Sequence, residues 1–252
     1  MVQASRRTTV RGPTFARLLA RLTDVDIPPS SQSLSDQLSQ WLDWTQAIAL
    51  STALDGKPSA DAAGAPAEGG TEADECARAR AALTQTIAND RELAAAVQRE
   101  VERAVAEQTC ANEAIDYTIF RQRYLELQRK MLMATGALRG RLRDRLAQAQ
   151  GMAQLAAVDA AMELALSARE QRLLAAVPDL LGTHFARLRR AEQKARADSQ
   201  GTENIPAAAP GAWLDVFRKD MQSVLLAELD VRFQPVEGLL AALRTRQLEC
   251  HV

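Results

Sequence analysis

Few residues of this 252-residue sequence have the type and spacing that catalysis or metal binding requires. There are two histidines, His184 and His251, and neither follows a glutamate by three residues as the histidines of helical di-metal sites do. No serine lies in the glycine pattern of a nucleophile elbow, and the P-loop and dinucleotide-binding glycine patterns are missing. We therefore predict no enzymatic activity, no catalytic residue, no metal and no cofactor. We expect His184 to be a partly buried histidine whose hydrogen bonds are satisfied.

Basic residues form the first feature with the chemistry to bind a partner. Residues 120–147 carry a local charge of +6, from eight basic and two acidic side chains. The basic residues are Arg121, Arg123, Arg129, Lys130, Arg139, Arg141, Arg143 and Arg145. Such a face is compatible with nucleic-acid binding, but apolar residues persist beneath it, and arginine stems also cover helix contacts. We favour a solvated or partner-facing helix face, with candidate partner-binding residues Arg139, Arg141, Arg143 and Arg145.

The N-terminal segment is a second basic region, with no acidic residue before Asp24. Its arginines are Arg6, Arg7, Arg11, Arg17 and Arg21. They have the charge to contact phosphates of nucleic acid or of anionic lipid, but we favour a solvated basic end or one that pairs with the acidic residues after Asp24. The whole chain has 31 basic and 32 acidic residues, so a globally basic nucleic-acid binder is excluded.

Two tryptophans form the other candidate binding feature. Trp41 and Trp44 are three residues apart, so they share one face of a predicted helix, near Ile48. Tryptophan concentrates binding energy at interfaces, which makes this pair a candidate partner-binding site. Burial in the core of the protein is the alternative interpretation.

Composition favours a folded, mainly helical protein in a reducing compartment. Hydrophobic residues make up 47% of the chain, enough for a core, whereas aromatic residues make up 4%, fewer than a sheet protein normally uses. The three cysteines, Cys76, Cys110 and Cys250, are far apart and odd in number, which argues against a disulfide-stabilised fold. The N-terminus lacks the apolar stretch of a signal peptide, and no window approaches the ~20 uncharged residues of a membrane span. We expect a soluble cytoplasmic protein with no transmembrane segment.

The first part of the chain, residues 1–55, is predicted to form an N-terminal helical hairpin. An apolar stripe at helical spacing follows Pro13, which suits the first turn of a helix. Ser33 can cap a second helix, with Asp36 three residues later as an imperfect capping box. This helix is expected to run unbroken to the following segment, residues 56–73, which is rich in Gly, Ala and Pro and predicts a flexible linker.

The middle of the chain, residues 74–198, is predicted to form a body of long helices. Residues 74–113 have the pattern of one continuous helix. Residues 120–173 follow a seven-residue apolar repeat that changes phase near residues 141–148, which favours a long coiled-coil-like helix. A hairpin turn at Gly151 is the alternative.

The C-terminal part resumes after a break. Pro178 is expected to kink or restart the helix of the body. Residues 199–211 predict a second linker, and residues 212–252 predict a C-terminal helix that is bent at Pro235 and packs back onto the body.

These elements together predict an all-α fold, an elongated bundle of long antiparallel, coiled-coil-like helices. A lone amphipathic helix is marginal in water, and burying its apolar stripe stabilises it by roughly 25 cal/mol per Å². Because long thin helices bury little area per residue, we also expect self-association.

Three blocks of sequence resemble a known group of proteins. They are VRGPTFARLLARLTDVD with QSLSDQLSQWLDWTQAIALSTALD, then DYTIFRQRYLELQRKM, then AWLDVFRKDMQSVLLAELDVRFQPVEGLLAALR. The chain is similar to an uncharacterised family from Gram-negative bacteria that is known only as a domain of unknown function. That family has no established activity, cofactor or catalytic residue. Its members are encoded beside proton-channel-like membrane proteins of the flagellar-stator class and beside peptidoglycan-binding proteins, so the resemblance implies an accessory of an envelope complex.

The leading functional hypothesis is therefore a non-enzymatic helical interaction or scaffold protein, which binds protein partners through its helical seams. The first alternative is a nucleic-acid-associated protein that uses the N-terminal arginines and the basic face of residues 120–147. The second is a peripheral membrane protein that uses an amphipathic N-terminal helix with Phe15 and Leu22.

Overall fold

The computed structural model describes residues 14–25, 32–56, 69–106, 115–199 and 212–250. Within these ranges the regular structure is helical and contains no strand, which confirms the predicted all-α class. The helices are α1 (Thr14–Thr23), α2 (Leu34–Trp41), α3 (Trp44–Asp55), α4 (Gly69–Ala88), α5 (Arg91–Ala106), α7 (Tyr117–Gln148), α8 (Ala153–Ala175), α9 (Val177–Ser199) and α10 (Ala212–Cys250).

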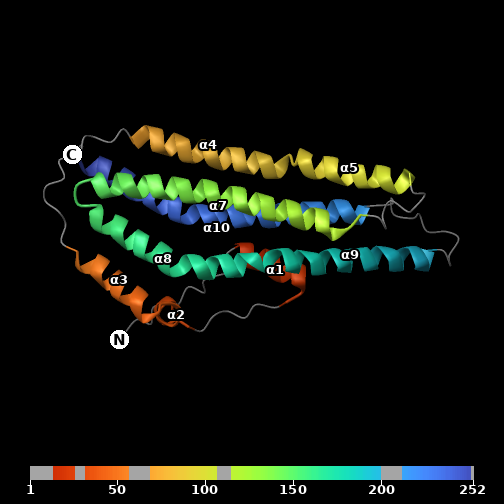
Figure 1. Ribbon diagram of the computed structural model, residues 1–252, viewed down its shortest axis with the longest axis horizontal. Coiled ribbons are helices and arrows are strands. Elements are labelled where there is room, and N and C mark those ends of the chain that lie inside the picture. Colours follow the sequence, from red (N-terminus) through yellow and green to blue (C-terminus); the bar gives the residue numbers. More distant parts are fainter. Residues whose placement is uncertain (1–13, 26–31, 57–68, 107–114, 200–211, 251–252) are drawn as a thin grey trace, which may run out of the picture.

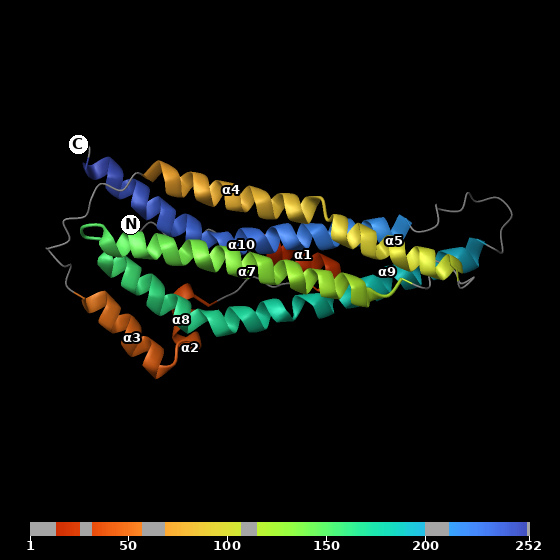
Figure 2. The same cartoon turned by 45° about the horizontal axis from the view of Figure 1, so that its top comes forward.

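The long helices lie side by side with their axes roughly aligned (Figure 1). Helices α7 and α10 pack against each other at the centre, with α4 and α5 on one side and α8 and α9 on the other (Figures 1 and 2). Helix α10 also contacts α4, α9 and α1, so it joins both sides of the bundle. The supercoiling of a coiled coil stays a prediction.

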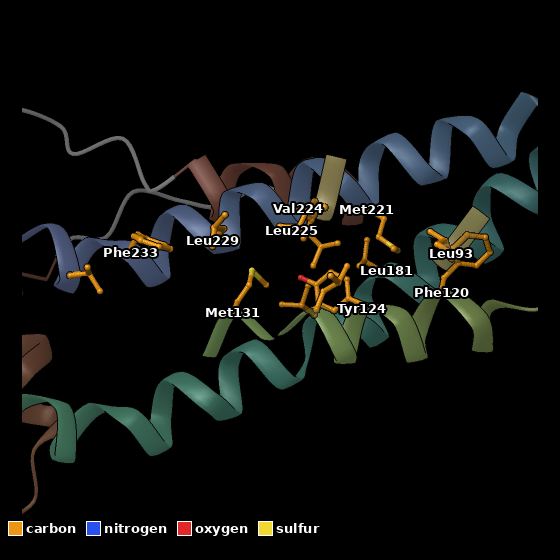
Figure 3. Packing of buried hydrophobic residues seen from close by; sticks show 14 of the residues in the cluster. Leu93, Phe120, Tyr124, Met131, Leu181, Met221, Val224, Leu225, Leu229 and Phe233 are labelled. Carbon is orange, nitrogen blue, oxygen red and sulfur yellow. The ribbon is translucent and has the colours of Figure 1, made fainter. Parts of the chain in front are cut away.

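The core lies along the contact between α7 and α10 (Figure 3). It includes an aromatic group in which Phe217 meets the rings of Tyr117, Phe120 and Phe185 in edge-to-face geometry, at centroid distances of 5.0 to 6.1 Å. Phe217 itself is fully buried. These few aromatic residues are concentrated where helices from three parts of the chain converge.

Residues 117–176 form a hairpin, so the predicted single long helix is wrong here and its alternative is correct. Helix α7 ends at Gln148 and α8 begins at Ala153, with Gly151 in the turn between them at φ 76°, a backbone conformation that favours glycine. The change of phase has a matching structural result, because Leu142 and Leu146 are buried just before the turn.

The predicted single helix over residues 74–113 is also wrong, because α4 and α5 are separated at Asn89 and Asp90. The Asp90 carboxylate accepts a hydrogen bond from the backbone N–H of Leu93 at 3.0 Å and so caps α5. The Gln222 side chain of α10 donates to the carbonyl of Ala88 at 3.1 Å, near the end of α4. Residues 107–113 of the predicted helix lie outside the described residues.

The second helix predicted for the N-terminal part is divided into α2 and α3. Ser33 and Asp36 form a complete capping box at α2, as predicted, and Asp43 forms a second box with Gln46 that starts α3. The predicted hairpin of residues 1–55 does not form as expected, because α1 packs mainly on α9 and α10 whereas α3 packs on α8.

The predicted linkers fall mostly on residues that the structure does not describe. Helix α4 begins at Gly69, so residues 69–73 belong to a helix and the predicted linker of residues 56–73 is too long at that end. Residues 57–68 and 200–211 lie outside the described ranges. Pro235 lies inside α10, which continues through it.

Pro178 stands in the first turn of α9, where backbone N–H groups have no partner within the helix, so the missing N–H of proline costs no hydrogen bond. The backbone carbonyl of Pro178 accepts a hydrogen bond from the Tyr117 hydroxyl of α7. The ring of Tyr117 then lies against Gly182, where an added Cβ would stand 2.9 Å from its Cε1. This glycine lets α7 and α9 approach closely.

Candidate functional site

The predicted basic face of α7 is paired with carboxylates of neighbouring helices. Arg139 holds Asp159 of α8 with Nε 3.0 Å from Oδ2 and Nη2 2.7 Å from Oδ1, and Arg143 reaches the same carboxylate at 3.0 Å. Both arginines also pair with Glu163, one turn further along α8. Arg139 and Asp159 are largely buried, so these charge-assisted bonds clasp α7 to α8.

The other two candidate arginines pair with α4. Arg141 binds Glu75, and Arg145 lies 3.0 Å from a carboxylate oxygen of Glu72. All four candidate residues therefore contact carboxylates of the same chain.

Arg123 is the most buried basic residue of this segment. Its Nε donates to Asp90 at 2.8 Å, and its guanidinium also pairs with Glu92 and Glu126. Burial acts to lower the pKa of Arg123, but hydrogen bonds to Asp90 and Glu126 outweigh it and raise the pKa above its ordinary value. Arg123 is consequently a structural cation that ties the start of α5 to α7.

The N-terminal arginines lie partly within the described residues. Arg21 of α1 lies 4.0 Å from Asp220 of α10, and Arg17 donates to the Thr14 hydroxyl of its own helix at 3.2 Å. Arg6, Arg7 and Arg11 lie outside the described residues.

The two tryptophans are not on one helical face, which corrects the prediction. Trp41 ends α2 and Trp44 begins α3, with the bend at Leu42 and Asp43 between them. Trp41 is half-buried and its ring lies under the guanidinium of Arg169 of α8, 4.6 Å from the ring centroid. Trp44 is 80% exposed.

His184 is buried and has partners at both ring nitrogens, as predicted. Its Nε2 lies 2.8 Å from Asp220 of α10, and its Nδ1 lies 3.1 Å from the guanidinium of Arg187. Its ring also stacks at a tilt on Phe217. The arrangement joins α9 to α10.

The sequence analysis missed a charged cluster in the core between α7 and α10. Glu228 is fully buried and accepts hydrogen bonds from the Tyr124 hydroxyl at 2.6 Å and from the Gln128 amide at 3.0 Å. Arg232, one turn along α10, pairs with the same carboxylate at 2.8 Å. Burial, and secondly the Glu228 charge, raise the pKa of Tyr124 well above its ordinary value. The signal available in the sequence was the spacing of Glu228 and Arg232, four residues apart, which places them on the same helix face as the apolar residues Val224, Leu225 and Val236.

A cavity of about 420 Å³ lies between α4 and α7. Its lining includes the buried thiol of Cys76, the apolar side chains of Leu138 and Leu142, and the ion pairs that Arg141 and Arg145 make. Burial, and secondly the nearby Glu75, raise the pKa of the Cys76 thiol, which lowers the fraction of reactive thiolate.

In the ranges given above, no group of three or more His, Cys, Asp and Glu side chains is placed to hold a metal ion. Over the same ranges, none of the helices is both long and apolar enough to cross a membrane.

Comparison with known proteins places the chain in a family. Residues 1–245 match the family described as "Protein of unknown function (DUF3348)". The chain belongs to this family. No curated protein matches it, and no solved structure matches it. The predicted resemblance to an uncharacterised family is thereby confirmed.

Large apolar side chains remain exposed on several helices of this family member. The most exposed are Trp44 of α3, Met133 of α7, and Leu164 and Leu173 of α8, the last three at 69%, 73% and 63%. Across the α7–α8 hairpin the Gln128 amide donates a hydrogen bond to the carbonyl of Leu174, so Met133 and Leu164 lie within about two helical turns of each other along the hairpin. The chain thus presents exposed apolar groups on α7 and α8, the two helices that Arg139 and Arg143 join.

Proposed function

We propose that the protein is a non-enzymatic interaction protein that binds other helical proteins through apolar side chains on the surface of its bundle. The observation that carries this proposal is the exposure of Met133 and Leu164 on the α7–α8 hairpin, at 69% and 73%. Exposed large apolar side chains on neighbouring helices are typical of surfaces that bind a further helix.

The pairing of the basic residues supports this proposal over a nucleic-acid role. To bind phosphate, Arg139 and Arg143 would have to leave Asp159, a largely buried carboxylate that would lose its partners. Their place in the clasp suits them to hold the hairpin rigid, so that a partner meets a preformed surface.

The finer part of the proposal concerns location and partner. We propose that the protein acts in the cytoplasm and that its partner belongs to a proton-channel-like envelope complex. This part rests on the family resemblance and on the exposed hairpin surface together.

The test compares two substitutions that add the same charge to the exposed side of α8. Leu164→Glu removes an exposed apolar group, whereas the control Gln171→Glu changes an exposed polar residue on the same helix. We expect Leu164→Glu to lower self-association in light scattering, or cross-linking to a co-purified helical protein, by tenfold or more relative to the control. Equal behaviour of both variants and the unchanged protein would contradict the proposal, as would nucleic-acid binding that weakens steeply with salt.

A further inference from the structure

Helix α3 is the least buried of the described helices that pack on the bundle, and it belongs to a segment, residues 32–56, that we call the α2–α3 arm. None of the side chains of α3 is buried. Helix α3 lies on the outer side of α8, away from α4, in both ribbon views (Figures 1 and 2), and α8 is its main partner. The arm is therefore attached to the bundle on one side only.

The inner face of α3 has a simple chemistry. Its half-buried residues are Gln46, Ala49, Leu50 and Ala53, which recur at helical spacing, whereas Trp44 and Ile48 point away and are exposed. Two of these four residues are alanines, so the side of α3 that meets α8 is partly small, while the outer side also carries the large apolar side chains of Trp44 and Ile48.

The face of α8 beneath the arm is an apolar stripe bounded by two polar contacts. Gln154 donates a hydrogen bond to the carbonyl of Leu54 at one end, and Arg169 covers the ring of Trp41 at the other. Between these contacts, helical spacing places three residues on the same face of α8, and all three are partly or fully buried: Val158, Met162 and Ala165. The two helices run antiparallel.

We infer that this face of α8 is a helix-binding groove and that the α2–α3 arm is its built-in occupant, which a partner helix of the same chemistry displaces. That partner is a helix with alanines and one leucine on its inner face, like Ala49, Leu50 and Ala53 of the arm, and an aromatic residue that stacks under Arg169. The inference rests on the proposed function and names the groove and its regulation.

The energetics favour displacement of the arm over displacement of any central helix. Regions with few buried contacts open locally at a small fraction of the global unfolding free energy. Because the arm is tethered, its effective concentration at the groove is high. The apparent affinity for an added helix is then the intrinsic affinity multiplied by the fraction of molecules in which the groove is empty. A change that loosens the arm without altering α8 should therefore raise that affinity.

The experiment measures binding of a fluorescent peptide with the sequence of residues 33–56 to the full-length protein. Trp41→Ala removes the stacking on Arg169 from the arm and leaves α8 unchanged, so it should tighten peptide binding roughly three- to tenfold. The matched control is Trp44→Ala, the exposed tryptophan of the same arm, which should bind the peptide as the unchanged protein does. Only the arm residue that contacts α8 should matter.

A second experiment holds the α2–α3 arm in the groove with a cross-link. Leu54→Cys with Gln154→Cys, in a chain with Cys110→Ser and Cys250→Ser, allows a short bismaleimide to join the arm to α8. The cross-linked protein should lose peptide binding, and the same variant before cross-linking should keep it.

Three results would overturn the inference: peptide binding to the cross-linked protein, equal binding by the Trp41→Ala and Trp44→Ala variants, or dimerisation of the Trp41→Ala variant, which would make a second copy the occupant. The Leu164→Glu comparison reads a different face of α8. A failure of the groove is therefore distinguishable from a failure of the proposed function.

Discussion

The central helix α10 and the peripheral helix α3 differ in how far they bury their side chains. Helix α10 buries Phe217, Glu228 and Phe233 almost completely, whereas α3 buries none of its side chains. Helix α10 is held by neighbours on several sides, whereas α3 rests mainly on α8. The contrast teaches that the helices that stabilise this fold are not the ones inferred to exchange with a partner. The central helices bury the core residues, and the outer arm is the part that a partner helix can displace.

The core charge cluster gives the largest expected effect on this contrast. Glu228→Ala would leave Arg232 without its closest carboxylate and remove the acceptor of Tyr124 and Gln128. We expect a loss of about 3–5 kcal/mol in the free energy of unfolding, measured by urea denaturation. The control Glu237→Ala breaks an exposed pair with Arg80 and should cost less than about 1 kcal/mol. Similar costs for both variants would show that the core is not the privileged region.

The close approach of α7 and α9 gives an intermediate effect. Gly182→Ala would place a Cβ 2.9 Å from the Tyr117 ring, which is held by its hydrogen bond to Pro178. We expect a destabilisation of about 1–3 kcal/mol in thermal or urea unfolding. In Gly238→Ala the new Cβ meets open space within a helix, so the unfolding free energy should stay unchanged or rise by about 0.5–1 kcal/mol. An unaffected Gly182→Ala protein would contradict the tight contact.

Alkaline pH offers a smaller test of the same core. Burial raises the pKa of both Tyr117 and Tyr124, so ionisation of tyrosine is favoured in the unfolded chain. The stability contributed by the neutral tyrosines is present below about pH 10 and is lost as the pH rises above that value. The unfolding free energy should fall less steeply between about pH 9 and about pH 11 in the double variant Tyr117→Phe/Tyr124→Phe. Parallel slopes would argue against burial of these hydroxyls.

The smallest effects are expected in the arm. Trp44→Ala should change the free energy of unfolding by less than about 0.5 kcal/mol, since the side chain is 80% exposed. Trp41→Ala should cost about 0.5–1 kcal/mol through its stacking on Arg169 and should speed hydrogen exchange in α3 alone. A global loss of protection in the Trp41→Ala protein would mean that the arm is part of the core.

Local signals in the sequence were enough for the fold class and several helix ends. Ser33 with Asp36 and the turn at Gly151 act through neighbours in the chain, so their pattern can be read without a structure. The same kind of signal occurs at Asp43 with Gln46 and at Asp90, although an apolar stripe at helical spacing continues across both sites. Caps deserve more weight than a weak stripe, because an unsatisfied helix end costs more than a few half-buried side chains gain.

The candidate site depended on contacts that are distant in the sequence. Nothing near Arg139 or Arg143 reveals that Asp159 will neutralise them after the hairpin closes. Similarly, the stripe of α8 gives no sign that α3 covers it, since α3 precedes it by about a hundred residues. Charge counts along the chain therefore overestimated the free basic surface.

Asp90 gives the division between α4 and α5 a further meaning. One of its oxygens starts α5 and the other holds Arg123 of α7, while Gln222 of α10 meets the last carbonyls of α4. At this corner the packing partner changes: α4 packs mainly on α10, whereas α5 packs on α7. If α4 and α5 formed one straight helix, Arg123 would lose Asp90, the most buried of its carboxylate partners. The break between α4 and α5 is therefore held by this ion pair as well as by the helix cap.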